Sequence, residues 1–243
     1  MNIDCLTSQP LSGVRNMAVD EALLAWGRPV LRFYRWSEAT VSLGYFQRYA
    51  ERNDHAPSRD CPLVRRRSGG GAIVHDAELT YSLAIPHDSP LAKKRLELYE
   101  AIHHSFIAVL RCFGIPAEFS DTEQGGKNVF LCFQRLHPCD VVVRDGNRVL
   151  KILGSAQYRN KTGSVLQHGS LLLDRSTTAP EFDGIQQISH LLPPFSELIE
   201  PLKSRFTSDF SWNFQTFAPK TIEQAVAFFE KTRYTAVEWT RKK

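Results

Sequence analysis

One cysteine in the chain has surroundings that could support nucleophilic chemistry. Cys132 lies in the apolar segment VFLCF at 129–133, and a cysteine thiolate can attack a carbonyl and carry an acyl group as a thioester. A buried core cysteine is the alternative interpretation, since most such cysteines are buried. Cys139 is the nearby competitor, but it adjoins Asp140, whose negative charge would raise the pKa of the Cys139 thiol. We therefore favour Cys132 as the candidate nucleophile.

A lysine lies in an otherwise apolar segment further along the chain, VLKILGSAQY at 149–158. If Ile152 and Leu153 help to form the core, the ammonium of Lys151 lies in a cleft, where it could favour a nearby thiolate or stabilise an oxyanion. An exposed position on a strand is the alternative. Small and polar residues follow the lysine: Gly154, Ser155, Ala156 and Gln157.

A glycine segment, RRRSGGGA at 65–72, precedes both. Its glycines let backbone amides approach a ligand closely, and its arginines supply positive charge, so the loop suits an anionic or strongly polar ligand. It is not a Walker loop, because no Gly-Lys-Ser/Thr follows, and it is not a dinucleotide fingerprint, because the glycines precede a strand. The alternative is a flexible turn beside a solvated basic patch.

Two histidines accompany these segments. His75 and Asp76 resemble a base with its orienting carboxylate, but adjacent strand residues point to opposite faces, so we expect His75 to bind or hydrogen-bond within the loop. His168 belongs to a polar group that interrupts an apolar strand. Such insertions usually mark a bend or a site. The group is Gln167, His168, Gly169 and Ser170.

Composition limits the class of protein. The chain has 243 residues, a net charge of +4 and five scattered cysteines without the spacing of a zinc site or a disulfide framework. It contains no apolar run of transmembrane length, and its start lacks the layout of a secretory signal. We expect a cytoplasmic protein with free thiols and no metal. The mild charge makes an acidic partner plausible and does not require nucleic acid or a membrane.

Hydrophobic periodicity predicts a mixed fold. The Asp-Gly at 145–146 is typical of a hairpin turn. The pattern as a whole predicts an α+β fold, with helices packed on a mainly antiparallel sheet. Helices are expected at 12–26, 93–113, 195–206 and 222–231, and strands at 31–36, 40–46, 62–64, 79–85, 139–143, 149–158 and 164–173. In the helix at 93–113, the expected apolar face begins at Leu96 and continues through Ile102 and Phe106.

Three segments in this order resemble the lipoate branch of the biotin/lipoate protein ligase superfamily: RRRSGGGAIVHD with LTYSLAI, KILGSAQ, and LQHGSLLL. Within that branch, the chain is similar to the cysteine-dependent octanoyltransferases with a lipoate-ligase-like fold, in which a Cys-Phe pair precedes the lysine strand. Cys132-Phe133 occupies that place. The resemblance covers about residues 10–175. The hairpin between Asp140 and Lys151 is longer here, around 145–150, which leaves the geometry of Cys132 and Lys151 open.

The resemblance implies roles for these residues. Cys132 would carry the acyl thioester, and Lys151 would favour its thiolate and contact the acyl carbonyl. No metal is implied. The implied substrate-binding residues are Arg66, Ser68, Gly69, Gly70, Gly71, Ala72, His75, Gly154, Ser155, Ala156, Gln157, Gln167, His168 and Gly169.

The implied fold is a class II biotin ligase/lipoate ligase-like catalytic domain. It would span 1–243, with 179–243 as a helical C-terminal extension of the same domain. The implied activity is transfer of octanoyl from octanoyl-acyl carrier protein to a lysine of a lipoyl domain, such as glycine cleavage H protein or a 2-oxoacid dehydrogenase E2 subunit, without a cofactor. Acidic surfaces on both partners would suit the basic residues Arg65 to Arg67.

Two alternatives remain open at this point. One is an ATP- and Mg-dependent lipoate or octanoate ligase that works through an acyl-adenylate, with Cys132 structural. Ligases of the family commonly carry a further small C-terminal domain, and we expect the tail after Ala179 to be too short and too continuous with the core to form one. The other is a non-catalytic protein that binds lipoyl domains, against which the presence of both Cys132 and Lys151 argues.

Overall fold

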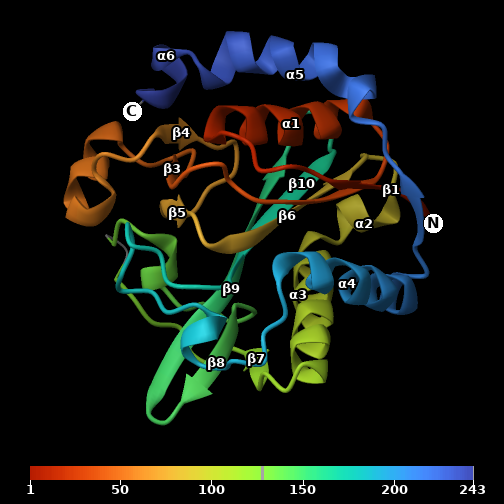
Figure 1. The fold of residues 1–243 in the computed structure, drawn as a ribbon. Helices are drawn as coiled ribbons and strands as arrows, with labels where there is room; N and C mark the ends of the chain where they lie inside the picture. The colour runs from red at the N-terminus through yellow and green to blue at the C-terminus, as the bar shows by residue number, and fades with distance from the viewer. Residues whose placement is uncertain (127–128, 243) are drawn as a thin grey trace.

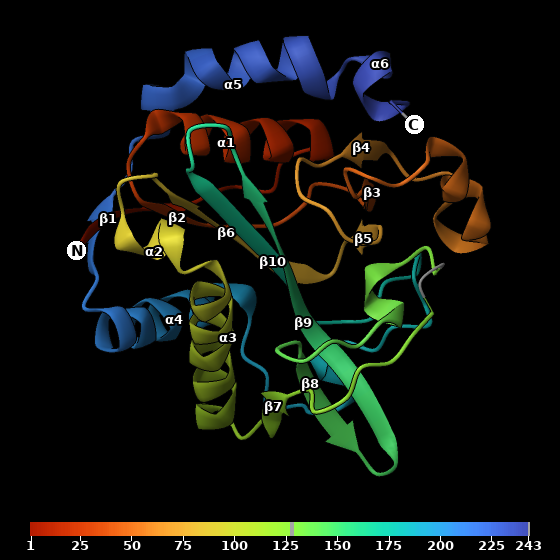
Figure 2. The ribbon, with the colours of Figure 1, turned by 180° about the vertical axis from the view of Figure 1, so that it is seen from behind.

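The computed structural model describes residues 1–126 and 129–242, and it contains two sheets (Figures 1 and 2). In the larger sheet the β11–β1 and β1–β2 pairs are parallel, and the other pairs are antiparallel. Its order is β11 (Asn213–Thr216), β1 (Asn2–Thr7), β2 (Val30–Tyr34), β6 (Glu78–Ile85), β10 (Val165–Leu172), β9 (Arg148–Arg159), β8 (Val141–Asp145) and β7 (Ala117–Phe119). The smaller sheet has the order β4 (Leu63–Arg65), β3 (Thr40–Leu43) and β5 (Ile73–His75).

Helices cover both faces of the larger sheet. On one face α1 (Gly13–Trp26) packs beneath α5 (Glu223–Phe229), and on the other α3 (Arg95–Cys112) packs against α4 (Phe195–Phe210) (Figure 1). The shorter helical segments are α2 (Pro90–Lys93), α6 (Val237–Thr240), the 3-10 turns η1 (Tyr49–Asp54), η2 (Ala56–Ser58), η3 (Cys132–Gln134), η4 (Ile185–Gln187) and η5 (Pro219–Ile222), and the π-helical turn η6 (Glu230–Tyr234).

Three hydrophobic clusters hold these layers together. One joins the sheet to α3 and α4 and includes Phe33, Phe106 and Phe206. A second joins the opposite face to α1 and α5, and a third fills the space between the smaller sheet and the segment 130–131. Burial of this apolar surface is the main force that fixes the sheets relative to each other.

The structure confirms the predicted α+β fold and its mainly antiparallel sheet. The helix predicted at 12–26 begins after Ser12, whose hydroxyl accepts from a backbone N–H of the first turn, and it ends at Gly27 in the left-handed conformation. The Asp-Gly hairpin is also confirmed. One assignment was wrong: Leu96, placed on the apolar face of the 93–113 helix, is 67% exposed, and the buried face runs through Leu98 and Ile102 instead.

The strands at 31–36 and 40–46 are present, but they belong to different sheets, so the chain passes from the larger sheet to the smaller one between them. The polar group at 167–170 does not bend its strand. β10 pairs in unbroken register with β6 and β9 along these residues. The polar side chains are therefore held at fixed places in a buried strand, which leaves a site as the remaining interpretation.

The C-terminal segment is tied to the strand that leads into the glycine loop. Arg65 at the end of β4 donates from Nε and one Nη to the carbonyl of Thr240, at 3.1 and 2.9 Å. In return, the indole N–H of Trp239 donates to the Arg65 carbonyl at 2.8 Å. Thr240 therefore packs against the end of β4, although it lies 175 positions after Arg65 in the sequence.

Candidate active site

Cys132 begins the turn η3 and is partly exposed. Its N–H donates to the Ala72 carbonyl at 2.7 Å, and the Ala72 N–H donates to the Phe130 carbonyl at 2.8 Å, so the glycine segment pairs with the segment that carries the thiol. A Cβ added to Gly71 would lie 2.9 Å from the Cys132 nitrogen, which explains why a residue without a side chain is needed there. Partial exposure in a turn argues against a sealed core cysteine.

The competing thiol has a different environment. Burial raises the pKa of Cys139 to about 11, and its contact with Glu100 and the charge of Asp140 act in the same direction. The raised pKa of Cys139 has the direction expected from Asp140, although burial contributes more to it than Asp140 does.

The guanidinium of Arg66 holds the glycine loop in shape. Its Nε donates to Ser68 Oγ at 3.2 Å, and one Nη donates to the carbonyl and the hydroxyl of Ser42 at 2.7 and 3.1 Å. The other Nη donates to the carbonyls of Gly69 and Gly71 at 2.8 and 2.6 Å. All five N–H groups of the side chain are engaged by the protein, so a direct bond from Arg66 to substrate would require one of these to break.

The structure overturns the interpretation of Arg65 to Arg67 as an exposed basic patch. Arg65 and Arg66 are fully buried and donate to backbone carbonyls, and Arg67 forms an ion pair with Glu21 at 2.6 Å. Burial lowers the pKa of Arg66 to about 10, although the nearby Cys132 opposes that shift. Arg66 therefore remains charged at neutral pH. These arginines are structural supports of the loop, because their fork of donors satisfies carbonyls that turn inward.

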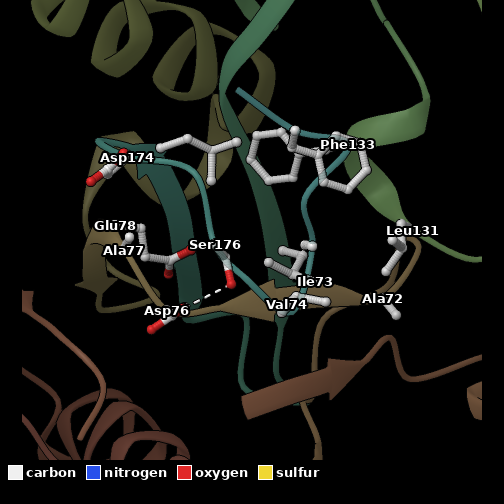
Figure 3. Close-up of a pocket in the computed structure, with 13 residues that line it drawn as sticks. Ala72, Ile73, Val74, Asp76, Ala77, Glu78, Leu131, Phe133, Asp174 and Ser176 are labelled. Atoms are coloured by element: carbon white, nitrogen blue, oxygen red, sulfur yellow. Dashed lines mark hydrogen bonds between the residues drawn. The ribbon is translucent and has the colours of Figure 1, made fainter. Parts of the chain in front are cut away.

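His75 hydrogen-bonds within the site, as expected. Its Nε2 lies 2.7 Å from Ser42 Oγ, and its Nδ1 lies 2.7 Å from Glu78 Oε1. Asp76 instead accepts a hydrogen bond from the hydroxyl of Ser176 at 2.7 Å (Figure 3). The partner of His75 is thus the carboxylate three residues on, and the adjacent carboxylate does not support it.

His168 has a parallel arrangement on the other side of Arg66. Its Nε2 lies 2.5 Å from Ser68 Oγ, and its Nδ1 lies 3.8 Å from Asp20 Oδ2, beyond hydrogen-bond reach. Burial lowers the pKa of His168, so the ring is neutral at physiological pH. Burial alone would raise the pKa of Asp20. The pKa is lowered instead, because the effects of His168, of Ser82 and of the ion pair with Arg32 at 2.7 Å together exceed the effect of burial.

Lys151 is buried and paired with a carboxylate. Its Nζ lies 2.7 Å from Asp140 Oδ2 and donates to the Arg135 carbonyl at 3.1 Å. The register of the β8–β9 hairpin shifts between Val141 and Val142, and such a bulge redirects neighbouring side chains. A Cβ on Gly154 would lie 2.8 Å from Lys151 Cε, so the glycine leaves room for the lysine to fold back. No hydrogen bond in the described part of the chain joins this ammonium to Cys132.

The hydroxyl of Ser155 hydrogen-bonds with two buried side chains, those of Tyr81 and His103. Its hydroxyl lies 2.7 Å from Tyr81 Oη and 2.6 Å from His103 Nε2, and the hydroxyl of Tyr99 contacts its backbone N–H and carbonyl. Burial lowers the pKa of His103 to about 3, so the ring is neutral at physiological pH. A Cβ on Gly169 would collide with the Ser155 hydroxyl, which makes this close approach possible only for glycine.

The remaining predicted residues lie along the same strands. The amide of Gln157 donates to Gln167 Oε1 at 2.7 Å and to the Arg95 carbonyl at 2.8 Å, and Gln167 donates to Tyr81 Oη. These bonds connect β9, β10 and β6 with the start of α3. The polar side chains of β9 and β10 thus form one continuous network.

Several predicted residues surround one small cavity. Its volume of about 10 Å³ suits a single water molecule, whereas a benzene-sized guest occupies about 150 Å³, so an acyl chain would require the cavity to open. The lining residues are Met17, Tyr34, Arg66, Ile73, His75, Thr80, Ala156, His168, Gly169 and Ser170.

Two further hollows adjoin the glycine segment. One of about 20 Å³ lies between Phe133, Leu131 and the strand residues Ile73 and Val74 (Figure 3). A wider surface groove of about 450 Å³ is lined by Gly70, Gly71, Phe130 and Arg135 among others. The glycine loop thus separates a closed interior from an open groove beside the turn that carries the thiol.

Sequence reasoning missed part of this site. Asp20 lies on the apolar face of its helix, three residues after Met17, and a carboxylate at such a position was a usable signal. His103 follows Tyr99 by one helical turn and was likewise detectable. The residues not foreseen are Asp20, Ser42, Glu78, Tyr81, Tyr99 and His103.

In the described part of the chain, no group of three His, Cys, Asp or Glu residues could hold a metal ion, and no helix is long and apolar enough to cross a membrane.

Comparison with known proteins identifies the family of this chain. The model of the lipoyl protein ligase A/B catalytic domain matches residues 12–226. The chain belongs to this family. The octanoyltransferase LipM of Bacillus cereus is 34% identical over 241 residues, which cover 93% of this chain and 82% of the relative. The LipM of Moorella thermoacetica is 41% identical over 169 residues, which cover 65% of this chain and 60% of the relative. The chain thus spans less than two thirds of the latter.

Solved structures of the lipoyl ligase family share the fold. Protein Ta0514 of T. acidophilum, described as a putative lipoate protein ligase, has a TM-score of 0.78 at 21% identity, with full coverage of both chains. A lipoate-protein ligase A bound with ATP has a TM-score of 0.77 at 21% identity, with 99% of each chain covered. These confirm the predicted lipoate-ligase-like fold.

Proposed function

We propose that this protein is an octanoyltransferase of lipoate biosynthesis that acts through a thioester at Cys132. The observation that carries the proposal is the place of this thiol, which is partly exposed in a turn and fixed by its own backbone to the glycine segment. The LipM relatives, at 34–41% identity, support the choice of acyl transfer. Lys151 and the loop residues 66–75 line the surroundings in which the acyl carbonyl would be held.

The reaction has two balanced steps. The Cys132 thiolate attacks the carbonyl of octanoyl-acyl carrier protein, and the tetrahedral intermediate expels the carrier thiolate, which leaves octanoyl-Cys132. A neutral lysine amine of a lipoyl domain then attacks this thioester, expels the Cys132 thiolate and passes its proton to it, which gives the amide and the free thiol. A thioester is consumed and an amide is formed, so the transfer needs no ATP.

The protein would stabilise the charge that develops in this reaction and would bind the octanoyl chain away from water. The tetrahedral intermediates place negative charge on the former carbonyl oxygen, and donors fixed before the reaction stabilise such charge most effectively. Backbone N–H groups of the glycines at 69–71 and the ammonium of Lys151 are the candidate donors. The octanoyl chain would enter between β10 and α1 and widen the small cavity beside His168 and Gly169.

The donor and the acceptor are both carrier proteins with acidic surfaces in this proposal. Since Arg65 to Arg67 are buried or paired, the charge that meets such partners must lie elsewhere. Lys93, Lys94 and Arg95 are exposed at the α2–α3 junction, and the Arg95 carbonyl accepts from Gln157 of the site. This junction, which continues into the exposed Leu96, is the edge at which an acidic carrier would dock.

Intact-mass analysis tests the thioester. The protein is incubated with octanoyl-acyl carrier protein alone, and wild type is expected to gain one octanoyl group that hydroxylamine removes. Cys132→Ala should gain none, and the matched variant Cys139→Ala, which removes the neighbouring thiol, should behave as wild type. Full octanoyl transfer to a lipoyl domain by Cys132→Ala would sink the proposal.

A ligase is the second candidate, because solved lipoate ligases share the fold over almost the whole chain. The discriminating arm supplies ATP, magnesium and free octanoate or lipoate with a lipoyl domain. Modification that depends on ATP and survives in Cys132→Ala would establish the ligase. Modification from octanoyl-acyl carrier protein without ATP, lost in Cys132→Ala, supports the transferase.

A further inference from the structure

The cation at the centre of the site is Arg66, and no carboxylate in the described part of the chain lies within ion-pair distance of it. Its five N–H groups all donate to neutral oxygens, three carbonyls and two hydroxyls. A buried charge without a counter-ion is unfavourable unless another group compensates it. The arrangement therefore leaves an uncompensated positive field in the interior.

Two carboxylates reach Arg66 only through intermediates. On one side the order is Glu78, His75, Ser42 and then Arg66, and every step is a hydrogen bond of 2.7 to 3.1 Å. Each hydroxyl can accept from Arg66 and donate to an imidazole nitrogen, which places the ring proton on the side of the carboxylate. Glu78 Oε1 also accepts from three further donors, Trp36, Thr80 and Ser170, whereas Glu78 Oε2 is buried without a hydrogen-bond partner.

A second chain of hydrogen-bonding side chains, on the other side of Arg66, has the same pattern. It runs from Asp20 through His168 and Ser68 to Arg66, with the 3.8 Å gap between Asp20 and His168 as its loosest step. Asp20 already forms an ion pair with Arg32. Both chains therefore end on a serine hydroxyl that orients Arg66 without neutralising it.

Arg66 and Cys132 are linked through the glycine loop. Arg66 binds the Gly71 carbonyl, and Gly71 packs against the backbone of Cys132. A thiolate at Cys132 would raise the pKa of Arg66, against the larger effect of burial. Lys151, the other nearby cation, is paired with Asp140 at 2.7 Å, and a paired charge exerts a weaker field on its surroundings than an unpaired one.

We propose that Arg66 is the fixed cation that favours the thiolate of Cys132, and that His75 and His168, backed by Glu78 and Asp20, are positioning residues that hold it. The proposal rests on the thioester at Cys132 proposed above. It transfers the role of thiolate stabiliser from Lys151 to an arginine that touches no reacting atom. Lys151, which is paired with Asp140, would then act only on the acyl carbonyl.

The test follows alkylation of Cys132 by iodoacetamide from about pH 5 to pH 9, read for that residue alone by peptide mass spectrometry. The variable is the midpoint of the pH–rate profile, because a purely structural defect changes the plateau rate and not the midpoint. Arg66→Gln removes the charge. The matched variant removes the other cation with its partner, Lys151→Met together with Asp140→Asn, and loss of a whole buried pair is often tolerated.

Arg66→Gln is expected to raise the midpoint by about one pH unit or more, which slows alkylation about tenfold below the midpoint. The double variant at Lys151 and Asp140 should keep the wild-type midpoint. A shifted midpoint in the double variant, or an unshifted one in Arg66→Gln, overturns the proposal.

A further pair keeps the test valid if Arg66→Gln does not fold. Ser42→Ala with Ser68→Ala leaves the charge in place but cuts both chains, and it should raise the midpoint by a smaller amount. An unchanged midpoint in that variant refutes the role of the histidines. Alkylation needs no acyl donor, so failure of this proposal and failure of octanoyl transfer are observed separately.

Discussion

Addition of one methyl group at Gly71 should displace the nucleophile, whereas the same change at Gly69 should not. A Cβ at Gly71 would lie 2.9 Å from the Cys132 nitrogen and 3.0 Å from the Phe130 oxygen. Both are backbone atoms, so no side chain can rotate away, and the turn must move by about half an ångström to restore ordinary contact. Overpacking of this kind destabilises by about 1–3 kcal/mol.

The expected loss of activity follows from that displacement. A misplacement of about 1 Å can reduce a rate about 100-fold, so half of it should slow formation of octanoyl-Cys132 roughly tenfold. At Gly69 the nearest atom to an added Cβ is a ring carbon of Phe46 at 3.6 Å, an ordinary contact. Gly69→Ala should therefore fold and react as wild type, or be more stable by about 0.5 kcal/mol through loss of unfolded-state entropy.

Rapid-quench intact-mass measurement of the acyl-enzyme, with urea unfolding alongside, checks both variants. Wild-type kinetics in Gly71→Ala would refute the packing argument. An equal loss in Gly69→Ala would show that the loop needs flexibility and not close approach.

Two further predictions concern pH and surface charge. Because His103 titrates near pH 6.5 when unfolded and only at about 3 when folded, the unfolded chain binds the extra proton, and stability falls by about 1.4 kcal/mol per pH unit from about 6.5 towards 3. Urea unfolding should show this loss in wild type and less of it in His103→Gln; equal losses would contradict it. Lys93→Glu with Arg95→Glu should raise KM several-fold for octanoyl-acyl carrier protein and little for octanoyl-pantetheine, while the distant pair Lys220→Glu with Lys231→Glu should change neither; equal effects on the two donors would exclude docking at this edge.

The fold was predictable where local patterns decide it. Apolar residues at helical and strand spacing, the cap at Ser12 and the turn at 145–146 each act within a few residues, and the structure follows them. Passage of the chain between two sheets after Tyr34 depends on packing over long distances, which no local pattern records.

The site was predictable as a set of segments and not as a set of contacts. The glycine loop identified the backbone that approaches Cys132, but a run of three arginines ordinarily indicates a solvated surface, and here two are buried by bonds to inward-facing carbonyls. Asp140 was noticed only as the neighbour of Cys139. Its pairing with Lys151 depends on a register shift in the hairpin, which spacing along the sequence does not reveal.

The bond between Arg65 and the C-terminal segment also has a consequence for synthesis of the protein. The strand before the glycine loop leaves its last donors and its carbonyl without their partners until Trp239 and Thr240 have been made. A nascent chain still held at the ribosome would therefore carry Cys132 on an unfinished scaffold. Capacity to take up an acyl group should then appear only after residues 239–240 have left the ribosome and bonded to Arg65.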